Sequence, residues 1–443
     1  MLLVALTLGC AQPEASNPTE RLGGWTDHLG RAVHHRGMNV ASTAKTSADH
    51  LPGFDDAAYD LLPAYGITLV RYLVFWEAIE PTEGLYDDAY LDAVALDIQR
   101  LRDRDVEVML DFHQDVYGEG FGFTGFPRWT CDEAQYETFT PNTTSWALNY
   151  LAPEVQYCFD AFWASSELQD SYIAMATHAA SRLDALVIGY DTMNEPFWGT
   201  SAQEALETGA FGDFQAAVVD ALRAVSPDAW IALEPLAYTN FTGDSYLPFP
   251  ADISERGGLL YAPHFYPPYA ESGEGWDGTF EDEADWLNGL ADQADERGAG
   301  LWLGEFGIFA ENGNEVEYIR SVIDTLAARG ASTAYWAFDP GQIFDGETNA
   351  PGEVFTAWQR PFVHAMPGRM VSIAHDGSDS EVVYAPVLPD LPLTIVLPEG
   401  ACGTLTISTV PTMLGVGVVT TPGRIELYGE ATGEQWVGLA CAP

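Results

Sequence analysis

The sequence is short of basic residues. Of its 443 residues only 18 are Lys or Arg, against 66 Asp or Glu, so the formal net charge is −48. Phosphate binding needs clustered cations, which argues against nucleic acid as a partner. The same shortage argues against electrostatic adhesion to an anionic membrane surface. Because hydrophobic residues make up 47% of the chain and aromatic residues 12%, disorder is excluded, and the length suits one large and one small domain.

Lysine is almost absent. Lys45 is the only lysine, and the other 17 basic residues are arginines. Arginine usage with excess carboxylate is a compositional habit of the whole chain. A lysine in a chain that otherwise uses only arginine can be present for its chemistry, so Lys45 is a candidate functional residue.

Long apolar runs are absent as well. No stretch approaches the roughly 18 apolar residues that a membrane-spanning helix needs. The short apolar run at residues 1–9 ends at Cys10 and resembles the lipobox of a bacterial lipoprotein signal. This resemblance predicts lipidation of Cys10, with membrane attachment through that lipid, and makes 1–22 a signal and tether. The alternative is an apolar N-terminus that is no signal.

Cysteine is scarce, and four of the five cysteines fall into two local pairs. Cys131 and Cys158 lie 27 residues apart in one loop-like region, and Cys402 and Cys441 bracket the C-terminal segment. Two local disulfides suit an oxidising compartment. We therefore expect an exported protein, either an outer-membrane or cell-surface lipoprotein or a secreted one. Free buried thiols in a cytosolic protein are the alternative.

Short apolar runs alternate with helical stretches through most of the chain. Runs such as ITLVRYLVF and LVIGYDTM lack strict alternation, which is typical of strands buried on both faces. Eight such strands with intervening segments predict an α/β fold, a (β/α)₈ barrel over 23–366. The predicted strands are His34–Val40, Ile67–Phe75, Val106–His113, Ala185–Met193, Trp230–Leu233, Leu259–Phe265, Leu301–Phe306 and Ala334–Phe338. A doubly wound sheet is disfavoured because no glycine-rich phosphate turn follows the first strand.

The last part of the chain has a different character. Residues 367–443 are rich in Val, Thr, Gly and Pro, and segments such as GTLTISTV and GRIELYGE read as strands between turns. No helical period is visible there. We predict a small C-terminal β-sandwich without catalytic residues.

One connection is far longer than usual. The segment between His113 and Gln169 exceeds an ordinary strand-to-helix loop and is rich in aromatic residues, which argues for order and function. Phe121, Phe123, Phe126 and Trp129 are the candidates for an apolar lid. A satellite core under the loop is an equally good interpretation of most of these aromatics, and Trp129 can equally be a packing anchor.

Polar side chains stand where the predicted strands end. Catalytic groups of a (β/α)₈ barrel come from these carboxyl ends. The chain has no HExxH motif, no GxSxG elbow and no P-loop, so we expect neither metal nor organic cofactor. Carboxylates, histidines and aromatics converge instead.

Glu195 and Glu305 form the predicted catalytic pair. They end the fourth and seventh strands, which lie on opposite sides of an eight-stranded barrel. Glycoside hydrolysis needs one protonated and one ionised carboxyl, about 5 Å apart for retention and roughly 6.5–9.5 Å for inversion. Asn194 can bind a sugar hydroxyl and Tyr266 can hold the nucleophile. Glu234 also ends a strand, but no Asn precedes it, so it is not taken as the acid.

Four motifs carry a family resemblance. RYLVFWEAIEPTEGLYD, YDTMNEP, APHFY and LGEFG, in this order between Gly37 and Phe338, resemble glycoside hydrolase family 5, a retaining (β/α)₈ family. The resemblance implies Glu195 as acid/base and Glu305 as nucleophile. It also implies a set of residues around the sugar at the scissile bond: Arg71, His113, Asn194, His264, Tyr266 and Trp336.

Within that family, DFHQDVYGEGFGFTGFPRW is similar to a segment of the endoglycoceramidases. The similarity implies sugar binding by His113 and Asp115, and a β-sandwich after the barrel. A lysine after the first strand binds the glycan in that group, which implies the same role for Lys45.

The resemblance implies hydrolysis of the β-glycosidic bond between a glycan and a lipid aglycone by double displacement. The alternatives are a β-glucosidase acting on another aglycone, an endo-β-glucanase, or a non-catalytic carbohydrate-binding lipoprotein on the same barrel. The presence of both glutamates disfavours the last. The expected partner is a glycolipid or another β-glycoside, and we expect a monomer.

Overall fold

The computed structural model describes residues 24–442 except 253, 255, 273–275, 310–312, 411–418, 422 and 429–432. The segment 1–22, with Cys10, lies outside the described residues. Within the described ranges, no helix is both long and apolar enough to cross a bilayer.

The predicted (β/α)₈ barrel is confirmed. Its parallel strands follow one another in chain order, and β10 pairs with both β2 and β9, which closes the sheet. β3 shows why these segments form strands, since all six of its residues are buried between the barrel interior and the outer helices. The sixth barrel position consists of two short strands, β7 and β8. The strands are β2 (Arg36–Val40), β3 (Leu69–Val74), β4 (Glu107–Phe112), β5 (Gly189–Asp191), β6 (Trp230–Leu233), β7 (Leu259–Tyr261), β8 (His264–Phe265), β9 (Gly300–Phe306) and β10 (Ser332–Tyr335).

Helices surround the barrel, and several begin at side-chain caps. The carboxylates of Asp55 and Asp87 cap α1 and α3, and the hydroxyl of Ser165 caps α6. The α-helices are α1 (Asp56–Ala64), α2 (Trp76–Ile79), α3 (Asp88–Arg102), α4 (Glu133–Thr138), α5 (Pro153–Ala164), α6 (Ser166–Leu183), α7 (Gln203–Glu207), α8 (Ala210–Val225), α9 (Thr239–Thr242), α10 (Pro268–Ser272), α11 (Glu281–Glu296) and α12 (Glu315–Ala327). The 3₁₀ helices are η1 (Ser42–Lys45), η2 (Glu119–Phe121), η3 (Arg128–Thr130), η4 (Ala147–Leu151) and η6 (Glu353–Ala357).

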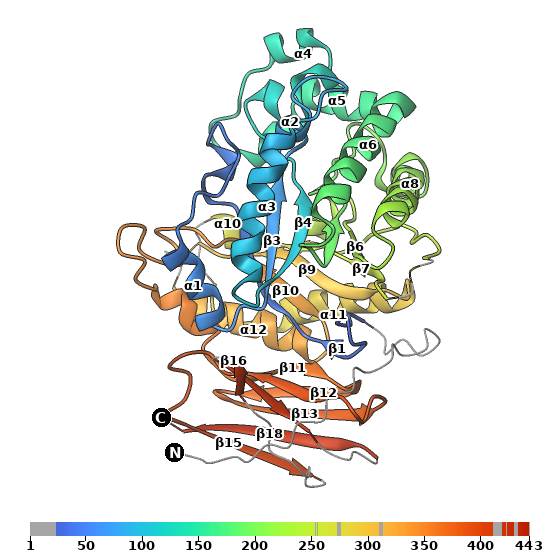
Figure 1. Cartoon of the computed structure of the whole chain (residues 1–443). Helices are drawn as coiled ribbons and strands as arrows, with labels where there is room; N and C mark the ends of the chain where they lie inside the picture. The colour runs from blue at the N-terminus through green and yellow to red at the C-terminus, as the bar shows by residue number, and fades with distance from the viewer. Residues whose placement is uncertain are drawn as a thin grey trace.

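The predicted β-sandwich is also confirmed, at the opposite end of the barrel from α4 and α5 (Figure 1). One sheet has the order β1-β11-β14-β17-β16 and the other β12-β13-β18-β15. β1 and β11 precede residue 367, so the sandwich takes in two strands that the sequence assigned to the barrel. The strands are β1 (Ala32–Val33), β11 (Phe362–Met366), β12 (Gly368–Asp376), β13 (Asp379–Pro386), β14 (Leu393–Val396), β15 (Thr404–Val410), β16 (Val419–Thr421), β17 (Arg424–Leu427) and β18 (Gln435–Ala442).

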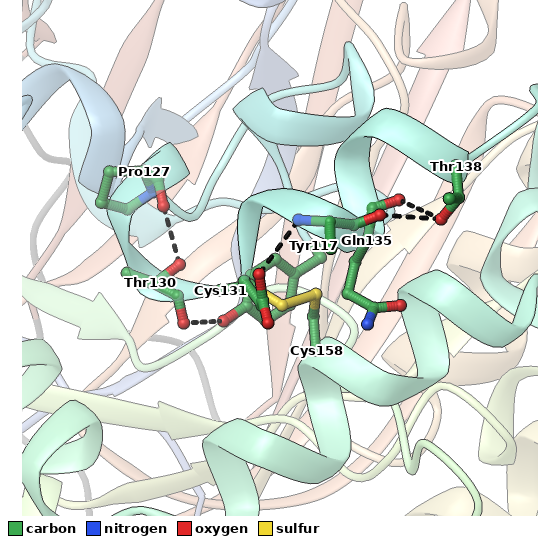
Figure 2. Close-up of a disulfide and its surroundings, with 9 residues drawn as sticks. Tyr117, Pro127, Thr130, Cys131, Gln135, Thr138 and Cys158 are labelled. Carbon is green, nitrogen blue, oxygen red and sulfur yellow. Dashed lines mark hydrogen bonds between the residues drawn. A yellow bond between two sulfur atoms is a disulfide. The ribbon is translucent and has the colours of Figure 1, made fainter.

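Both predicted disulfides are present. Cys402 and Cys441 join the end of the sandwich with a Cα–Cα distance of 5.3 Å. Cys131 and Cys158, 5.6 Å apart, tie η3 to α5 across the long insertion after β4. Figure 2 shows the neighbouring Thr130, whose hydroxyl donates to the carbonyl of Pro127 and whose own carbonyl accepts from Tyr117. The insertion is therefore an ordered unit above the barrel.

Two of the four lid candidates are core residues instead. Phe121 and Phe126 are buried, and Phe126 packs against Trp76 and Tyr117 with ring centroids 5.2 and 4.4 Å apart. Phe123 is half-buried against the same core, as is Trp129, whose indole N–H donates to the carbonyl of Glu80. Both rings belong to the same buried cluster as the side chains between the barrel strands and the outer helices, so Phe121 and Phe126 are core residues and form neither a lid nor a separate satellite core.

Candidate active site

The carboxyl ends of the barrel strands bring the predicted site residues to one face. Arg71 lies in β3, His264 in β8 and Glu305 in β9. The other predicted polar residues lie within five residues after the end of a barrel strand, and Lys45 is the last residue of η1. Parallel strands of a closed barrel end on the same face, so residues more than 200 positions apart in the chain become neighbours.

Glu195 and Glu305 face each other across this end of the barrel. One carboxylate oxygen from each, together with one ring nitrogen of His264, lie within 4.8 Å of one another. The side chain of Glu195 is 14% exposed and that of Glu305 is 7% exposed. The pair is thus partly accessible from one side and enclosed on the others.

Arg71 is the central cation of the site. Its guanidinium donates to Glu305 at 2.6 Å, to Asp191 at 2.9 Å and to Glu234 at 2.8 Å, and it lies 3.0 Å from Asp111. Burial alone would lower the pKa of Arg71, but these four carboxylates raise it well above its ordinary value. The cation is therefore permanent and fixes carboxylates from four different strands.

Glu305 is held by donors on both oxygens. Arg71 donates to Oε1, and the hydroxyl of Tyr266 donates to Oε2 at 2.9 Å. Burial raises the pKa of Glu305, while the charges of His264 and Arg71 oppose that rise. Tyr266 and Arg71 thus orient this carboxylate and stabilise its ionised form.

Glu195 is held through both its side chain and its backbone. Asn240 Nδ2 donates to Oε1 at 2.7 Å, and His264 Nδ1 contacts the same oxygen at 2.9 Å. The backbone φ of +41° lies in the left-handed region, and the amide N–H donates to Glu234 Oε2 at 2.7 Å. A non-glycine residue in this region is held there by its surroundings, as is common at functional sites.

His264 is a buried cation between carboxylates. Burial would lower its pKa, but the negative charges of Glu234 and Glu305 raise the pKa of His264 well above its ordinary value. Nε2 lies 3.2 Å from Glu234, and Nδ1 lies 3.6 Å from Glu305. The imidazolium therefore links both predicted catalytic carboxylates with a third one.

A second group surrounds Lys45 at the side of the pair. Lys45 Nζ lies 2.5 Å from Asp115 and 4.5 Å from the centroid of the Trp336 ring, which stacks on His113. Burial raises the pKa of Asp115, but Lys45 and His113 outweigh it and hold the pKa well below the ordinary value. β10 ends at Tyr335, so Trp336 follows the strand in which it was predicted. Cation, carboxylate and aromatic face together suit the recognition of a sugar.

All the predicted catalytic and sugar-binding residues are therefore brought together, including Asn194, whose side chain accepts from Arg71 and donates to the carbonyl of Gln114. Four further residues hold the site: Asn39, Gln114, Glu234 and Asn240. Of these, the sequence singled out only Glu234, and only as a residue not taken as the acid. Asn39 and Glu234 stand at strand ends, a position that could have pointed to them. Asn240 lies in the short helix α9 and gave no such indication.

The glutamate–histidine group has the spacing of a three-ligand metal site. However, its carboxylate oxygens already accept hydrogen bonds from Arg71, Tyr266 and Asn240. Cationic and N–H donors in these places favour anionic or hydroxyl-bearing ligands over a metal ion. The expected lack of a metal and of an organic cofactor stays a prediction.

Fold and site together define a class. A (β/α)₈ barrel with two facing carboxylates at the ends of its fourth and seventh strands, one bound by Arg and Tyr, is the architecture of a barrel glycosidase. The chain belongs to glycosyl hydrolase family 5, since the family model described as cellulase (glycosyl hydrolase family 5) matches residues 28–342.

Individual relatives are endoglycoceramidases and glucosylceramidases. Endoglycoceramidase I of Rhodococcus hoagii is 29% identical over 255 residues, which cover 54% of this chain and 51% of that protein. A glucosylceramidase of Rhizopus delemar is 26% identical over 254 residues, covering 43% of this chain and 37% of that protein. The matches thus span about half of these relatives' length or less.

A solved structure agrees over almost the whole chain. Endoglycoceramidase II from a Rhodococcus species superimposes with a TM-score of 0.85 and 28% identity, covering 95% of this chain and 100% of that one. Structures of the same relative include a complex with ganglioside GM3 and a lactosyl-enzyme intermediate.

Proposed function

We propose that the protein is a retaining β-glycosidase that hydrolyses the bond between a glycan and a lipid aglycone. The observation that carries the chemistry is the approach of Glu195 and Glu305, since one carboxylate oxygen of each lies within 4.8 Å of the other. This separation suits direct attack by one carboxylate and leaves no room for the water that an inverting enzyme places between them. The likeness to endoglycoceramidases supports the glycolipid substrate.

In the first step, an oxygen of Glu305 attacks the anomeric carbon while the carboxyl of Glu195 gives its proton to the leaving oxygen. The C–O bond to the lipid alcohol breaks, and a glycosyl ester with Glu305 forms. In the second step, Glu195 takes a proton from water, whose oxygen attacks the same carbon and releases Glu305. Two inversions leave the β configuration unchanged.

The group around Lys45 is proposed to bind the sugar. Lys45 and Asp115 offer a donor and an acceptor in close contact, and Trp336 offers a half-buried aromatic face beside them. Sugar hydroxyls need such paired polar groups, and the apolar faces of pyranose rings stack on aromatic rings. His113 holds both Trp336 and Asp115 in place, because its ring stacks on Trp336 and its Nε2 lies 3.4 Å from Asp115.

The lipid is proposed to lie against the insertion rather than under a phenylalanine lid. The insertion exposes several large apolar side chains in and next to η4 and α5: Trp146, Leu148, Leu151 and Tyr157. α4 and α5 stand over the end of the barrel away from the sandwich (Figure 1). Exposed apolar groups next to a polar site match a substrate with one polar and one apolar arm.

A substrate panel tests the function. We expect release of the intact oligosaccharide from lactosylceramide or a ganglioside, and no hydrolysis of carboxymethyl-cellulose. Release of glucose alone from aryl glucosides and glucosylceramide, with no intact oligosaccharide from longer glycolipids, would favour the β-glucosidase alternative.

Variants of the two glutamates test the mechanism. Glu195→Gln and Glu305→Gln should each abolish turnover of the glycolipid, and azide should rescue Glu305→Gly. Full activity of either glutamine variant would refute the assignment.

We also propose that the protein is exported and acts as a monomer, with Cys10 acylated. The two disulfides support an oxidising compartment. Labelling of expressing bacteria with a fatty-acid analogue should mark the full-length protein but not a Cys10→Ala variant. Light scattering of the purified protein should give the mass of a single chain, and a dimer mass would refute the monomer.

A further inference from the structure

Glu234 is a buried glutamate that contacts the site without facing its accessible side. It directly follows β6, the strand next to the one that leads to Glu195, and only 2% of it is exposed. Both of its carboxylate oxygens are occupied. Oε2 accepts from the amide of Glu195 at 2.7 Å, and Oε1 accepts from Arg71 at 2.8 Å.

The contact with the Glu195 amide acts on backbone geometry. Glu195 has a φ of +41°, which an L-residue rarely adopts without an external constraint. A charged acceptor makes a stronger and shorter hydrogen bond to an N–H than a neutral one. Glu234 therefore fixes the direction in which the Glu195 side chain leaves the main chain.

The contact with His264 acts on charge. Glu234 lies 3.2 Å from Nε2 of the imidazole, and Nδ1 on the other side of the ring lies 2.9 Å from Glu195 Oε1. The Glu234 carboxylate is the largest electrostatic contribution to the protonated form of His264, and the ring in turn holds the Glu195 carboxyl. Asn240 completes the arrangement, since it donates to Glu195 Oε1 and accepts from the His264 amide at 3.3 Å.

We propose that Glu234 is a positioning residue for the acid/base step, acting on Glu195 through its backbone amide and through the imidazolium of His264. This inference rests on the proposed function of Glu195 as acid/base. Glu234 donates no proton to the substrate and touches none of the reacting atoms. It sets where the proton of Glu195 stands and keeps a positive charge beside Glu195 when that residue is ionised in the second step.

The variant Glu234→Gln tests the inference, because it keeps size and burial but removes the charge and one acceptor. Glu207→Gln is a matched control: Glu207 is also fully buried and accepts from two backbone amides, those of Leu236 and Tyr246, on the loop after β6. Both variants should lose similar thermal stability. If Glu234 only stabilised the fold, Glu234→Gln would change thermal stability and no catalytic property beyond those that Glu207→Gln also changes.

The decisive readout is the dependence on leaving group. A dinitrophenyl glycoside needs no protonation of its leaving oxygen, whereas a glycolipid or alkyl glycoside does. We expect Glu234→Gln to lower kcat/KM for the alkyl glycoside on the order of 100-fold and for the dinitrophenyl glycoside by less than about fivefold. The alkaline limb of its pH profile should move to lower pH, because the pKa of His264 falls when the Glu234 charge is removed. Glu207→Gln should show neither effect.

Equal losses for both substrates in Glu234→Gln, or the same pattern in Glu207→Gln, would overturn the inference. The parallel variant Glu195→Gln separates this outcome from failure of the proposed function. If Glu195→Gln shows the leaving-group dependence and Glu234→Gln does not, only the positioning role is wrong. If Glu195→Gln itself hydrolyses the alkyl glycoside normally, the acid/base assignment is wrong and the role of Glu234 falls with it.

Discussion

At the scale of single residues, Lys45 connects composition with the site. The only lysine of the chain pairs with Asp115 beside Trp336, within the field of both predicted catalytic glutamates. Although burial opposes it, the charge of Asp115 raises the pKa of Lys45, so the cation persists at neutral pH. An ammonium group with three donors that already lies against a carboxylate and a ring is suited to a sugar hydroxyl.

Replacement of this lysine should weaken substrate binding. Lys45→Met removes a charge-assisted contact worth about 1.5–3 kcal/mol, so we expect KM for the glycolipid to rise roughly 10- to 100-fold with a smaller change in kcat. Arg128→Met is the matched control, because Arg128 also pairs with a carboxylate, Glu133, and lies 4.8 Å from the Tyr136 ring, but on the exposed insertion. Unchanged KM and kcat in Lys45→Met would exclude Lys45 from the binding site.

The site residues that could be predicted from the sequence are those that lie in a recognisable motif or at the end of a predicted strand. Glu195 directly follows Asn194, and Glu305 lies in the motif LGEFG at the end of a predicted strand. Both could therefore be predicted without a structure. The strand-end position of Glu234 could have pointed to the site, but its role and that of Asn240 could not be predicted, because these roles exist only through contacts with Glu195 and His264 across neighbouring strands. The register that creates these contacts is a property of the closed barrel.

At the scale of elements, the insertion between β4 and α6 is the part that the sequence described least well. Its aromatic content predicted order, but a list of aromatics does not say which rings face inward. Phe121 and Phe126 turn inward because η2 and the following turn wrap around Tyr117, while η4 points Trp146 and Leu148 outward. The sandwich shows the same limit, since the pairing of β1 with β11 joins segments more than 300 residues apart.

The disulfide in this insertion should stabilise it measurably. Closing a loop of 27 residues removes unfolded-state entropy worth about 3–4 kcal/mol. The double variant Cys131→Ser/Cys158→Ser should therefore open the insertion to proteolysis and lower glycolipid hydrolysis more than aryl glycoside hydrolysis, because α5 carries part of the exposed apolar surface. Cys402→Ser/Cys441→Ser is the control, and an equal effect on glycolipid hydrolysis in both would contradict the role of the insertion.

At the scale of the whole molecule, barrel and sandwich meet through buried histidines. His34 Nδ1 lies 2.7 Å from the carbonyl of Ala331, and His364 Nδ1 lies 3.1 Å from the carbonyl of His34. Burial, with a smaller contribution from Arg36, lowers the pKa of His34 to about 3, and burial likewise lowers the pKa of His35 to about 3 and that of His375 to about 2. These rings are therefore neutral in the folded protein at neutral pH.

This arrangement predicts acid lability. In the unfolded chain each ring takes up a proton below about pH 6.5, while the folded state resists until about pH 3, so stability is lost as the pH falls through that window. Each such histidine contributes a slope of about 1.4 kcal/mol per pH unit to the free energy of unfolding. Denaturant unfolding between pH 7 and pH 4.5 should show a shallower slope for His34→Gln than for the exposed control His28→Gln, and equal slopes would refute the account.

The central claim for the molecule is that Glu305 forms a covalent bond with the sugar while Glu195 handles the proton. A 2-deoxy-2-fluoro-β-lactosyl fluoride should trap that ester, because the fluorine slows both steps and the fluoride leaves without protonation. Mass spectrometry of the digested protein is predicted to find the added glycosyl mass on the peptide that contains Glu305. In Glu195→Gly the ester should form faster than it is hydrolysed, because its hydrolysis lacks the base. A label on another carboxylate, or hydrolysis of glycolipid by a preparation that is never labelled, would contradict the account.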